Sequence, residues 1–458
     1  MMPSRSSLTL LLCLAAGALT YALVDGPPPL RLGMSLFALI ASLWITQALP
    51  LSATALLVPA LAALTGVLTV KDALAAFAQP VIFLFLGGFA LASALTRHGL
   101  DRALALQVLK LARGRPRHAV FWLFGLTAVL SMWLSNTATT AMMLPLALGL
   151  LGTQAQADDP ATQRTRWFVL LGLAFSASIG GMATLVGSPP NAIAAAATQT
   201  SFAAWMMMAL PVAALLLPAS IGVLYLMLRP RWTPPPADPQ MAPKDHSEPP
   251  WQWTRDRLWT LAIFGLTVAG WVSGGWLGPA IGVSADMDTL VALLAIALLS
   301  VSKVVSWSDI ERQTQWGVLM LFGGGLALSQ VMMVTGTSDH LAQWLIGGLG
   351  GAHALVLLIG VVLAVMALTS FVSNTASAAL FIPVVLSLSA GTGLDHQGLA
   401  MAVALAASCA FMLPVATPPN AIVFASGLLP QREMLKQGAA VSAVAALLIS
   451  GWMWWAAP

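Results

Sequence analysis

The stretch Leu134-Ser135-Asn136-Thr137-Ala138-Thr139 has a second copy, because Val372-Ser373-Asn374-Thr375-Ala376-Ser377 repeats its pattern later in the chain. Each copy lies in the middle of a long apolar run. A second pair of polar patches follows, at Gly187-Ser188-Pro189-Pro190-Asn191 and Ala416-Thr417-Pro418-Pro419-Asn420. Backbone that breaks a helix inside a membrane is costly unless it lines a cavity or is buried in protein. The doubled patches therefore predict one shared binding site.

The composition is that of an all-α polytopic membrane protein. Of the 458 residues, 59% are hydrophobic and only 8% are charged, whereas soluble domains contain about 25% charged residues. A membrane β-barrel would show short alternating segments, and this chain has long continuous apolar runs instead. The net charge of +4 does not indicate nucleic-acid binding, because the basic residues flank the apolar runs. Both cysteines lie inside apolar runs, which argues against a disulfide framework.

The apolar runs predict about eleven transmembrane helices. Residues 119–151 are too long for one crossing and are interrupted by Ser135-Asn136-Thr137, and residues 352–390 repeat this pattern. We interpret both as re-entrant helical hairpins; a single kinked helix is the alternative. We expect residues 8–24 to be a retained first helix, since they form a poor signal-peptide cleavage site. The other predicted crossings are 32–49, 51–68, 81–96, 167–191, 203–228, 258–277, 289–302, 317–335, 399–420 and a last one containing 442–457, of which 167–191 and 399–420 are broken helices.

The two halves of the chain form an internal repeat. Leu84 pairs with Leu321, an offset of 321 − 84 = 237, and Asn136 pairs with Asn374, an offset of 238. The Pro-Pro-Asn copies differ by 420 − 191 = 229. Such a slow drift over several landmarks indicates a true repeat. If the hairpins do not cross, an odd number of crossings separates the copies, so the repeat is inverted. The predicted division is residues 1–31 (first helix and loop), 32–229 (repeat one), 230–256 (proline-rich cytoplasmic linker) and 257–458 (repeat two).

The basic residues set the predicted orientation. Residues 97–117 form a basic, amphipathic stretch that we expect to lie along the membrane interface. Placing it in the cytoplasm leaves only Arg31 and Lys71 of the 20 Lys and Arg outside. Positive charge gathers on the cytoplasmic side of membrane proteins. The amino terminus is therefore predicted inside and the carboxy terminus outside.

The acidic residues and histidines are informative by their positions. All 16 Asp and Glu fall at or beyond the ends of the predicted spans, and the 6 His lie in loops. A proton-coupled carrier usually keeps an ionisable relay inside the membrane. A membrane enzyme would need a buried base, a carboxylate pair or a metal. Neither class is indicated, so we expect no enzyme.

Neutral oxygens and backbone groups remain for binding. At a hairpin tip, the second helix begins with free amides, which bind a carboxylate without a fixed positive charge. Two facing tips suit an anion with two charged ends, while the carbonyls at the end of the first helix suit a hard cation such as Na⁺. Ser131 and Thr369 lie four residues before Ser135 and Ser373, on the same helical face. The alternative, an ordinary capped kink, is disfavoured by the doubling.

These motifs resemble the divalent anion/sodium symporter family of di- and tricarboxylate transporters, from about residue 32 to the carboxy terminus. The resemblance implies a bacterial inner-membrane homodimer with a scaffold (32–117 and 257–350) and a transport part (118–229 and 351–458) that moves as an elevator. It implies two Na⁺ sites, one of Ser131, Ser135, Asn136 and Gly187 and one of Thr369, Ser373, Asn374 and Ala416. The implied substrate-binding residues are Ser135, Asn136, Thr137, Ser188, Ser373, Asn374, Thr375, Thr417 and Pro418.

The predicted function is Na⁺-coupled import of a C4-dicarboxylate such as succinate, malate or fumarate. No cofactor is expected; Na⁺ is the coupling ion, and membrane lipid and a second copy are the other partners. A dianion entering a site without protein charge needs cations for neutrality, and no fixed basic group lies near the motifs to replace them. The alternatives are a Na⁺-independent exchanger of the same family, an anion channel, and a sulfate or citrate carrier.

Overall fold

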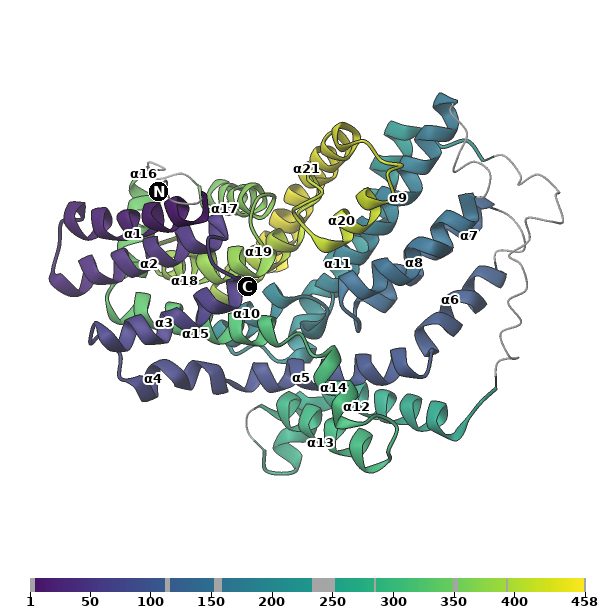
Figure 1. Ribbon diagram of the computed structural model, residues 1–458, viewed down its shortest axis with the longest axis horizontal. Helices are drawn as coiled ribbons and strands as arrows, with labels where there is room; N and C mark the ends of the chain where they lie inside the picture. Colours follow the sequence, from purple (N-terminus) through teal and green to yellow (C-terminus); the bar gives the residue numbers. More distant parts are fainter. Residues whose placement is uncertain are drawn as a thin grey trace.

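The computed structural model describes residues 5–111, 116–151, 159–232, 252–283, 286–348, 353–392 and 394–456. Within these ranges the chain is helical and has no β-strand. Most of the predicted linker, residues 233–251, lies outside the described residues. Figure 1 shows the helices arranged as one elongated body.

The helices follow each other in the same order in the two halves. Helix α1 (Arg5–Leu23) packs against α2 and precedes the repeat. Repeat one contains α2 (Pro28–Thr46), α3 (Leu51–Leu64), α4 (Val70–Ala75), η1 (Ala76–Ala78), α5 (Pro80–Arg97), α6 (Leu100–Leu111), α7 (Pro116–Ser131), α8 (Asn136–Leu151), α9 (Pro160–Met182), η3 (Leu185–Gly187), α10 (Pro189–Thr198) and α11 (Phe202–Leu228). Repeat two contains α12 (Arg255–Ala280), α13 (Met287–Val301), α14 (Trp307–Gln313), α15 (Trp316–Val334), α16 (Thr337–Gly348), α17 (Ala354–Thr369), α18 (Asn374–Thr392), α19 (His396–Ser408), α20 (Pro418–Ala425) and α21 (Gln431–Ala456).

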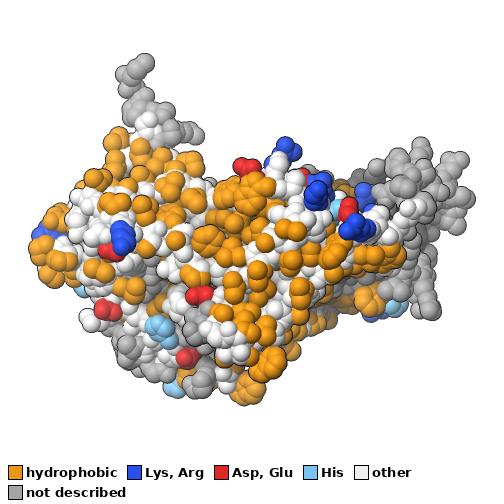
Figure 2. Space-filling view, turned by 90° about the horizontal axis from the view of Figure 1, so that it is seen from below, with side chains coloured by type: hydrophobic (Ala, Val, Ile, Leu, Met, Phe, Trp, Pro, Cys, Tyr) orange, Lys and Arg blue, Asp and Glu red, His pale blue; other side chains and the backbone are white. Residues whose placement is uncertain are grey.

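The described helices have the lengths and surfaces of a membrane protein. Seven of them are long and apolar enough to cross a bilayer, and shorter apolar helices such as α3 and α13 accompany them. Large hydrophobic side chains are exposed on α12 and α13, among them Trp276 (77%) and Val301 (81%). Figure 2 shows hydrophobic side chains spread over much of one face. Such a surface suits lipid, and the predicted class, an all-α polytopic membrane protein, is confirmed. The number of crossings and their orientation stay predictions.

The two long interrupted runs are pairs of helices, as predicted, and not single kinked helices. Helix α7 ends at Ser131 and α8 begins at Asn136, and the two helices pack against each other. The Ser135 hydroxyl accepts a hydrogen bond from the Ala138 amide (3.2 Å), so it caps the first turn of α8. Helices α17 and α18 form the corresponding pair, with Asn374 as the first residue of α18.

The first broken helix extends further than predicted beyond its break. The sequence placed the first break near the end of a span at residues 167–191. In the structure α9 ends at Met182 and α10 continues to Thr198, so the break falls in the middle. The reason is that Pro189 begins α10 instead of ending α9, since proline fits the first helical turn, where its missing N–H has no partner to lose. Pro418 begins α20 in the same way.

The two halves make matching helix contacts, in which a helix of each half packs against the counterpart helix of the other half. Helix α5 packs against α13, and its repeat counterpart α15 packs against α3. A Cβ built on Gly87 of α5 would lie 2.6 Å from the Ala292 Cβ, and one on Gly324 of α15 would lie 2.6 Å from the Ala55 Cβ. Small residues at such crossings let helix backbones approach closely in membranes. The matched contacts support the inverted repeat.

Substitutions at these crossings test the packing. We expect Gly87→Leu or Gly324→Leu to destabilise the fold by about 1–3 kcal/mol, because overpacking forces the helices apart. The apparent unfolding temperature in detergent should fall. Gly222→Leu is the matched control, since a Cβ on Gly222 of α11 meets no atom within 4 Å. Equal unfolding temperatures for the three variants would contradict the packing argument.

Candidate functional site

A cavity of about 330 Å³ brings the four polar patches of the sequence together. All nine predicted substrate-binding residues line it, and so do Gly187 and Ala416. They come from the loops that precede α8, α10, α18 and α20 and from the first residues of α8, α18 and α20. The cavity is also lined by Phe85, Gly88, Phe89 and Ala92 of α5, and by Gln47, Gln315 and Val318.

The electrostatic character of the cavity comes from backbone amides. Helices α8, α10, α18 and α20 all begin at its wall. The amino end of a helix carries a partial positive charge, which favours an anion. Helices α8 and α18 also begin with residues that carry an N–H, whereas α10 and α20 begin with two prolines, which have none. The described residues that line the cavity include no Asp, Glu, Lys, Arg or His. The arrangement can therefore hold an oxyanion at neutral side chains.

Oxygen atoms of repeat one converge beside the first hairpin tip. The Asn136 Oδ1 position lies 2.6 Å from the Ser131 Oγ, 3.2 Å from the Ala177 carbonyl and 3.3 Å from the Gly187 carbonyl. An amide nitrogen turned to this position would donate to these atoms, whereas an amide oxygen there completes a ring of oxygens. Such a ring is what a hard cation takes as ligands. Of the first predicted cation set, Ser131, Asn136 and Gly187 therefore meet.

Repeat two has a corresponding cluster. The Thr369 Oγ1 lies 2.8 Å from the Asn374 Oδ1 and 2.8 Å from the Ala407 carbonyl. Ser373 and Ala416, the other members of the second predicted cation set, line the cavity near Asn374. The carbonyls of Ala177 and Ala407 were missed by the sequence analysis, because every residue carries a carbonyl and only helix packing shows which one faces a site.

Several predicted residues use their hydroxyls to hold the structure. The Ser188 Oγ lies 3.2 Å from the Ser408 Oγ, and this buried contact joins the two repeats. The Thr417 Oγ1 accepts the Asn420 amide and caps α20. Thr375 is buried, while Thr137 is half-buried at the cavity wall. Thr137 and Thr375 line the cavity on opposite hairpin tips.

Asn191 and Asn420 hold the two helix breaks in the same way. The Asn191 Nδ2 donates to the carbonyls of Gly181 (2.9 Å) and Thr184 (2.7 Å). The Asn420 Nδ2 donates to the carbonyls of Ala410 (2.8 Å) and Leu413 (3.0 Å), and both pairs of acceptors are offset by 229 residues. The sequence marked these asparagines as a repeated motif and assigned them no role.

Thr184 was missed by the sequence analysis, although it joins the break to the hairpin. Its hydroxyl donates to the Met132 carbonyl at the tip of the first hairpin and accepts the Gly187 amide (3.2 Å). A lone threonine in an apolar run gives no signal of such a role. The contact fixes the Gly187 loop relative to the residues around Asn136.

Paired helix hairpins and paired broken helices around a neutral central cavity are features of membrane transporters. The family comparison agrees, because the chain matches the citrate transporter family over residues 41–406 and 348–457. The protein belongs to this family. The predicted resemblance to di- and tricarboxylate transporters and the predicted multi-pass location in the bacterial cell membrane are confirmed at this level.

Relatives align with nearly the whole chain. An uncharacterised transporter of Haemophilus influenzae is 45% identical over 93% of this chain and 92% of its own length. An uncharacterised transporter of Methanocaldococcus jannaschii is 37% identical over 95% of this chain and 96% of its own length. The sodium-dependent dicarboxylate transporter SdcS of Staphylococcus aureus is 31% identical over 90% and 82%.

Two solved structures share the fold at low sequence identity. MtrF of Neisseria gonorrhoeae has a TM-score of 0.60 at 14% identity and covers 99% of this chain and 95% of its own. The YdaH transporter of Alcanivorax borkumensis has a TM-score of 0.56 at 16% identity, with 85% and 88% covered. These likenesses concern the fold alone.

Proposed function

We propose that the protein is a Na⁺-coupled symporter that imports a C4-dicarboxylate such as succinate, malate or fumarate. The observation that carries this proposal is the cavity in which four helix amino ends meet between two oxygen clusters, without an ionisable side chain in its described lining. The sodium-dependent dicarboxylate transport named for the relative SdcS supports it.

The two helix pairs suit the two ends of a dicarboxylate. One carboxylate binds at Asn136 and Thr137, where α8 begins, and the other binds at Asn374 and Thr375, where α18 begins. Helix amides supply partial positive charge there. Because these partial charges do not neutralise a dianion, bound cations are needed to balance it in a poorly hydrated site.

Sodium ions supply that balance at the two oxygen clusters. In the first, Na⁺ takes oxygens from Ser131, Asn136 and Gly187, with the Ala177 carbonyl added. In the second it takes those of Thr369, Asn374 and Ala407, completed by Ser373 and Ala416. Each asparagine belongs to a cation cluster and also lines the anion cavity. This double contact would couple the two ligands.

The proposed transport movement is based on which helices contribute residues to the cavity wall. We propose that the hairpins, the broken helices, α11 and α21 form the transport part, and that α5 and α15 belong to a fixed scaffold, which dimerises. Gln47 and Gln315 lie at the predicted cytoplasmic ends of α2 and α15, and both line the cavity. We therefore assign the structure to an inward-facing state of an elevator cycle.

Uptake by proteoliposomes tests the function. We expect accumulation of labelled succinate that requires an inward Na⁺ gradient and is lost when K⁺ replaces Na⁺. Unlabelled malate and fumarate should compete, whereas sulfate should not. Uptake with K⁺ alone that needs internal dicarboxylate would identify an exchanger. Currents that reverse at the anion's equilibrium potential without Na⁺ would identify a channel.

Citrate is the second candidate substrate, because the matching family is described as that of a citrate transporter. The cavity of about 330 Å³ has room for a third carboxylate beside the hairpin tips. Unlike a C4-dicarboxylate, citrate carries a central carboxylate that neither tip would bind. In the same uptake assay, competition by citrate at lower concentration than succinate would favour the tricarboxylate.

A further inference from the structure

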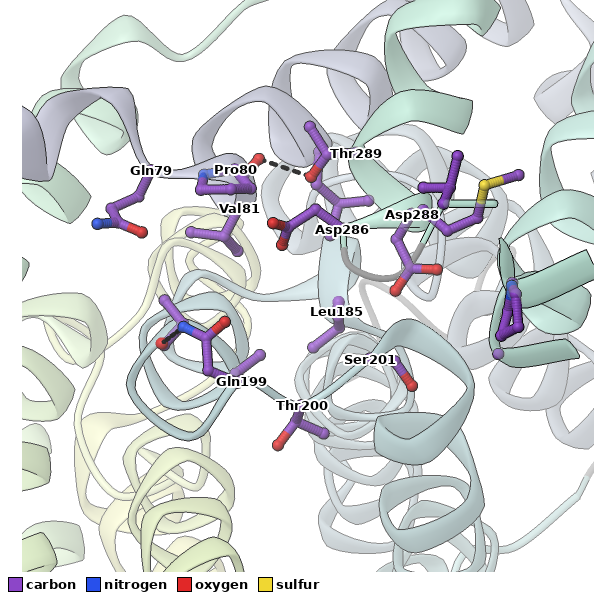
Figure 3. A pocket seen from close by; sticks show the side chains of 18 residues that line it. Gln79, Pro80, Val81, Leu185, Gln199, Thr200, Ser201, Asp286, Asp288 and Thr289 are labelled. Carbon is purple, nitrogen blue, oxygen red and sulfur yellow. Dashed lines mark hydrogen bonds between the residues drawn. The ribbon is translucent and has the colours of Figure 1, made fainter. Parts of the chain in front are cut away.

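A second cavity, of about 320 Å³, lies where the predicted outer ends of the scaffold helices meet the turn between α10 and α11. Figure 3 shows Asp286 and Asp288 facing it from the start of α13, with Gln199 and Ser201 on the opposite side. Gln79 and Val81, at the start of α5, also line this cavity. The site proposed for substrate uses none of these residues.

The repeat relates this outer cavity to the substrate cavity. Val81 corresponds to Val318, with the same offset (318 − 81 = 237) as Leu84 and Leu321, and Gln79 and Gln315 each directly precede the first residue of α5 and of α15. Gln315 and Val318 line the substrate cavity, whereas Gln79 and Val81 line the outer cavity alone. The start of α15 in repeat two therefore lines the substrate cavity, whereas the corresponding start of α5 in repeat one lines the outer cavity.

Phe202, the first residue of α11, contacts the scaffold beside the outer cavity. Its amide donates to the Asp288 Oδ2 (2.6 Å), and its ring stacks on Trp271 of α12 with centroids 4.7 Å apart. The ring of Trp133, which lines the substrate cavity, also stacks with the Phe202 ring, with centroids 6.2 Å apart. We name Phe202, Trp271 and Asp288 the closed seam. It joins the proposed transport part to the scaffold.

The corresponding position of repeat one, on the predicted cytoplasmic side, has no carboxylate like that of Asp288. The indole N–H of buried Trp271 donates to the Asp288 carbonyl (2.9 Å), and that of buried Trp44 donates to the Leu51 carbonyl (3.3 Å). Leu51 therefore occupies the Asp288 position in repeat one, in agreement with the offset of 288 − 51 = 237. The counterpart of Phe202 is Gln431 (431 − 202 = 229), which is exposed.

We propose that Asp288 is a one-sided latch, a positioning residue that holds the transport part in the inward-facing position. The proposal rests on the proposed alternating movement. A charged acceptor strengthens a hydrogen bond, and a contact present in only one of two states shifts the equilibrium toward that state. Since leucine cannot accept the Gln431 amide through its side chain, no matching bond holds the opposite state.

Labelling of the detergent-purified protein with a water-soluble maleimide, which reaches both of its sides, tests the latch without any substrate. The background carries Cys13→Ala and Cys409→Ala, both buried positions. Ala195→Cys reports the closed side, because Ala195 lines the outer cavity and is 3% exposed, whereas its counterpart Phe424 (424 − 195 = 229) is half-buried. Gln315→Cys reports the open side, where Gln315 is exposed.

Asp288→Ala should raise the labelling rate at position 195 by about tenfold and lower it at position 315, because the loss of a hydrogen bond to a charged acceptor shifts the populations that far. Asp288→Asn keeps a hydrogen-bond acceptor, so its labelling rates should lie between those of the unsubstituted background and those of Asp288→Ala. Asp286→Asn is the matched control, two residues away on the same cavity wall, and should change neither rate.

The paired reporters separate a shifted equilibrium from a loosened fold. Faster labelling at both positions would mean general destabilisation, and unchanged rates would mean that Asp288 holds nothing; either result overturns the latch. An equal effect of Asp286→Asn would overturn it as well. Because no transported ligand enters the assay, failure of the Na⁺–dicarboxylate assignment in uptake experiments leaves this result readable by itself.

Discussion

Asn136→Ala is expected to reduce Na⁺-driven dicarboxylate uptake at least about 100-fold. The substitution removes the amide that lies 2.6 Å from the Ser131 Oγ and faces the Ala177 and Gly187 carbonyls. It also removes a polar group from the cavity wall at the start of α8. Each partner left unpaired in a buried site costs about 1–3 kcal/mol. Two such losses, one for the cation and one for the anion, have a central value of about 4 kcal/mol, which is more than a factor of 100.

Asn136→Asp separates the two roles of this residue. Aspartate keeps an oxygen for the cation, adds a negative charge and cannot donate to a carboxylate. We expect Na⁺ binding to persist while dicarboxylate binding is lost, as measured by Na⁺- and succinate-induced thermal shifts. Asn374→Ala should match Asn136→Ala, and Thr65→Ala, an exposed position outside the cavity, should transport normally. Normal uptake by Asn136→Ala with unchanged folding would remove Asn136 from the site.

Gly181→Ala has the second largest expected effect. A Cβ on Gly181 would lie 2.3 Å from the Asn136 Oδ1 and 2.9 Å from the Gly187 carbonyl, so it would occupy the space between the oxygens of the first cluster. The Gly187 backbone and the half-buried Asn136 amide cannot move aside cheaply where the helices are packed. We expect the Na⁺ concentration for half-maximal uptake to rise at least about tenfold.

Two comparisons make the Gly181 prediction specific. Gly125→Ala on α7 adds the same methyl group where nothing lies within 4 Å, and it should leave uptake unchanged. Repeat two carries Ala410 at the position equivalent to Gly181 (410 − 181 = 229). The second cluster therefore tolerates a methyl group that the first does not. Unaltered Na⁺ dependence in Gly181→Ala would show that the first cluster holds no coupling cation.

The helices could be predicted because their signals are local. Apolar length located α5, α11 and α15 within a few residues of their bounds. The doubled Ser-Asn-Thr motif located both hairpin tips, since serine and asparagine cap a helix start. The end of the first broken helix was predicted too early, because proline marks a helix boundary without stating which helix it belongs to. Pro189 in fact begins α10.

The site could be predicted only where side chains define it. The sequence alone determined the membrane class, the repeated order of the helices and the neutral side chains at the hairpin tips, because periodicity, composition and capping can be read from the residues themselves. The tertiary structure decided which carbonyls join Asn136 and Asn374, and it placed the Phe202 amide against Asp288. Every residue carries a carbonyl and an amide, so these partners leave no mark in the sequence, and only the packing of distant helices selects them.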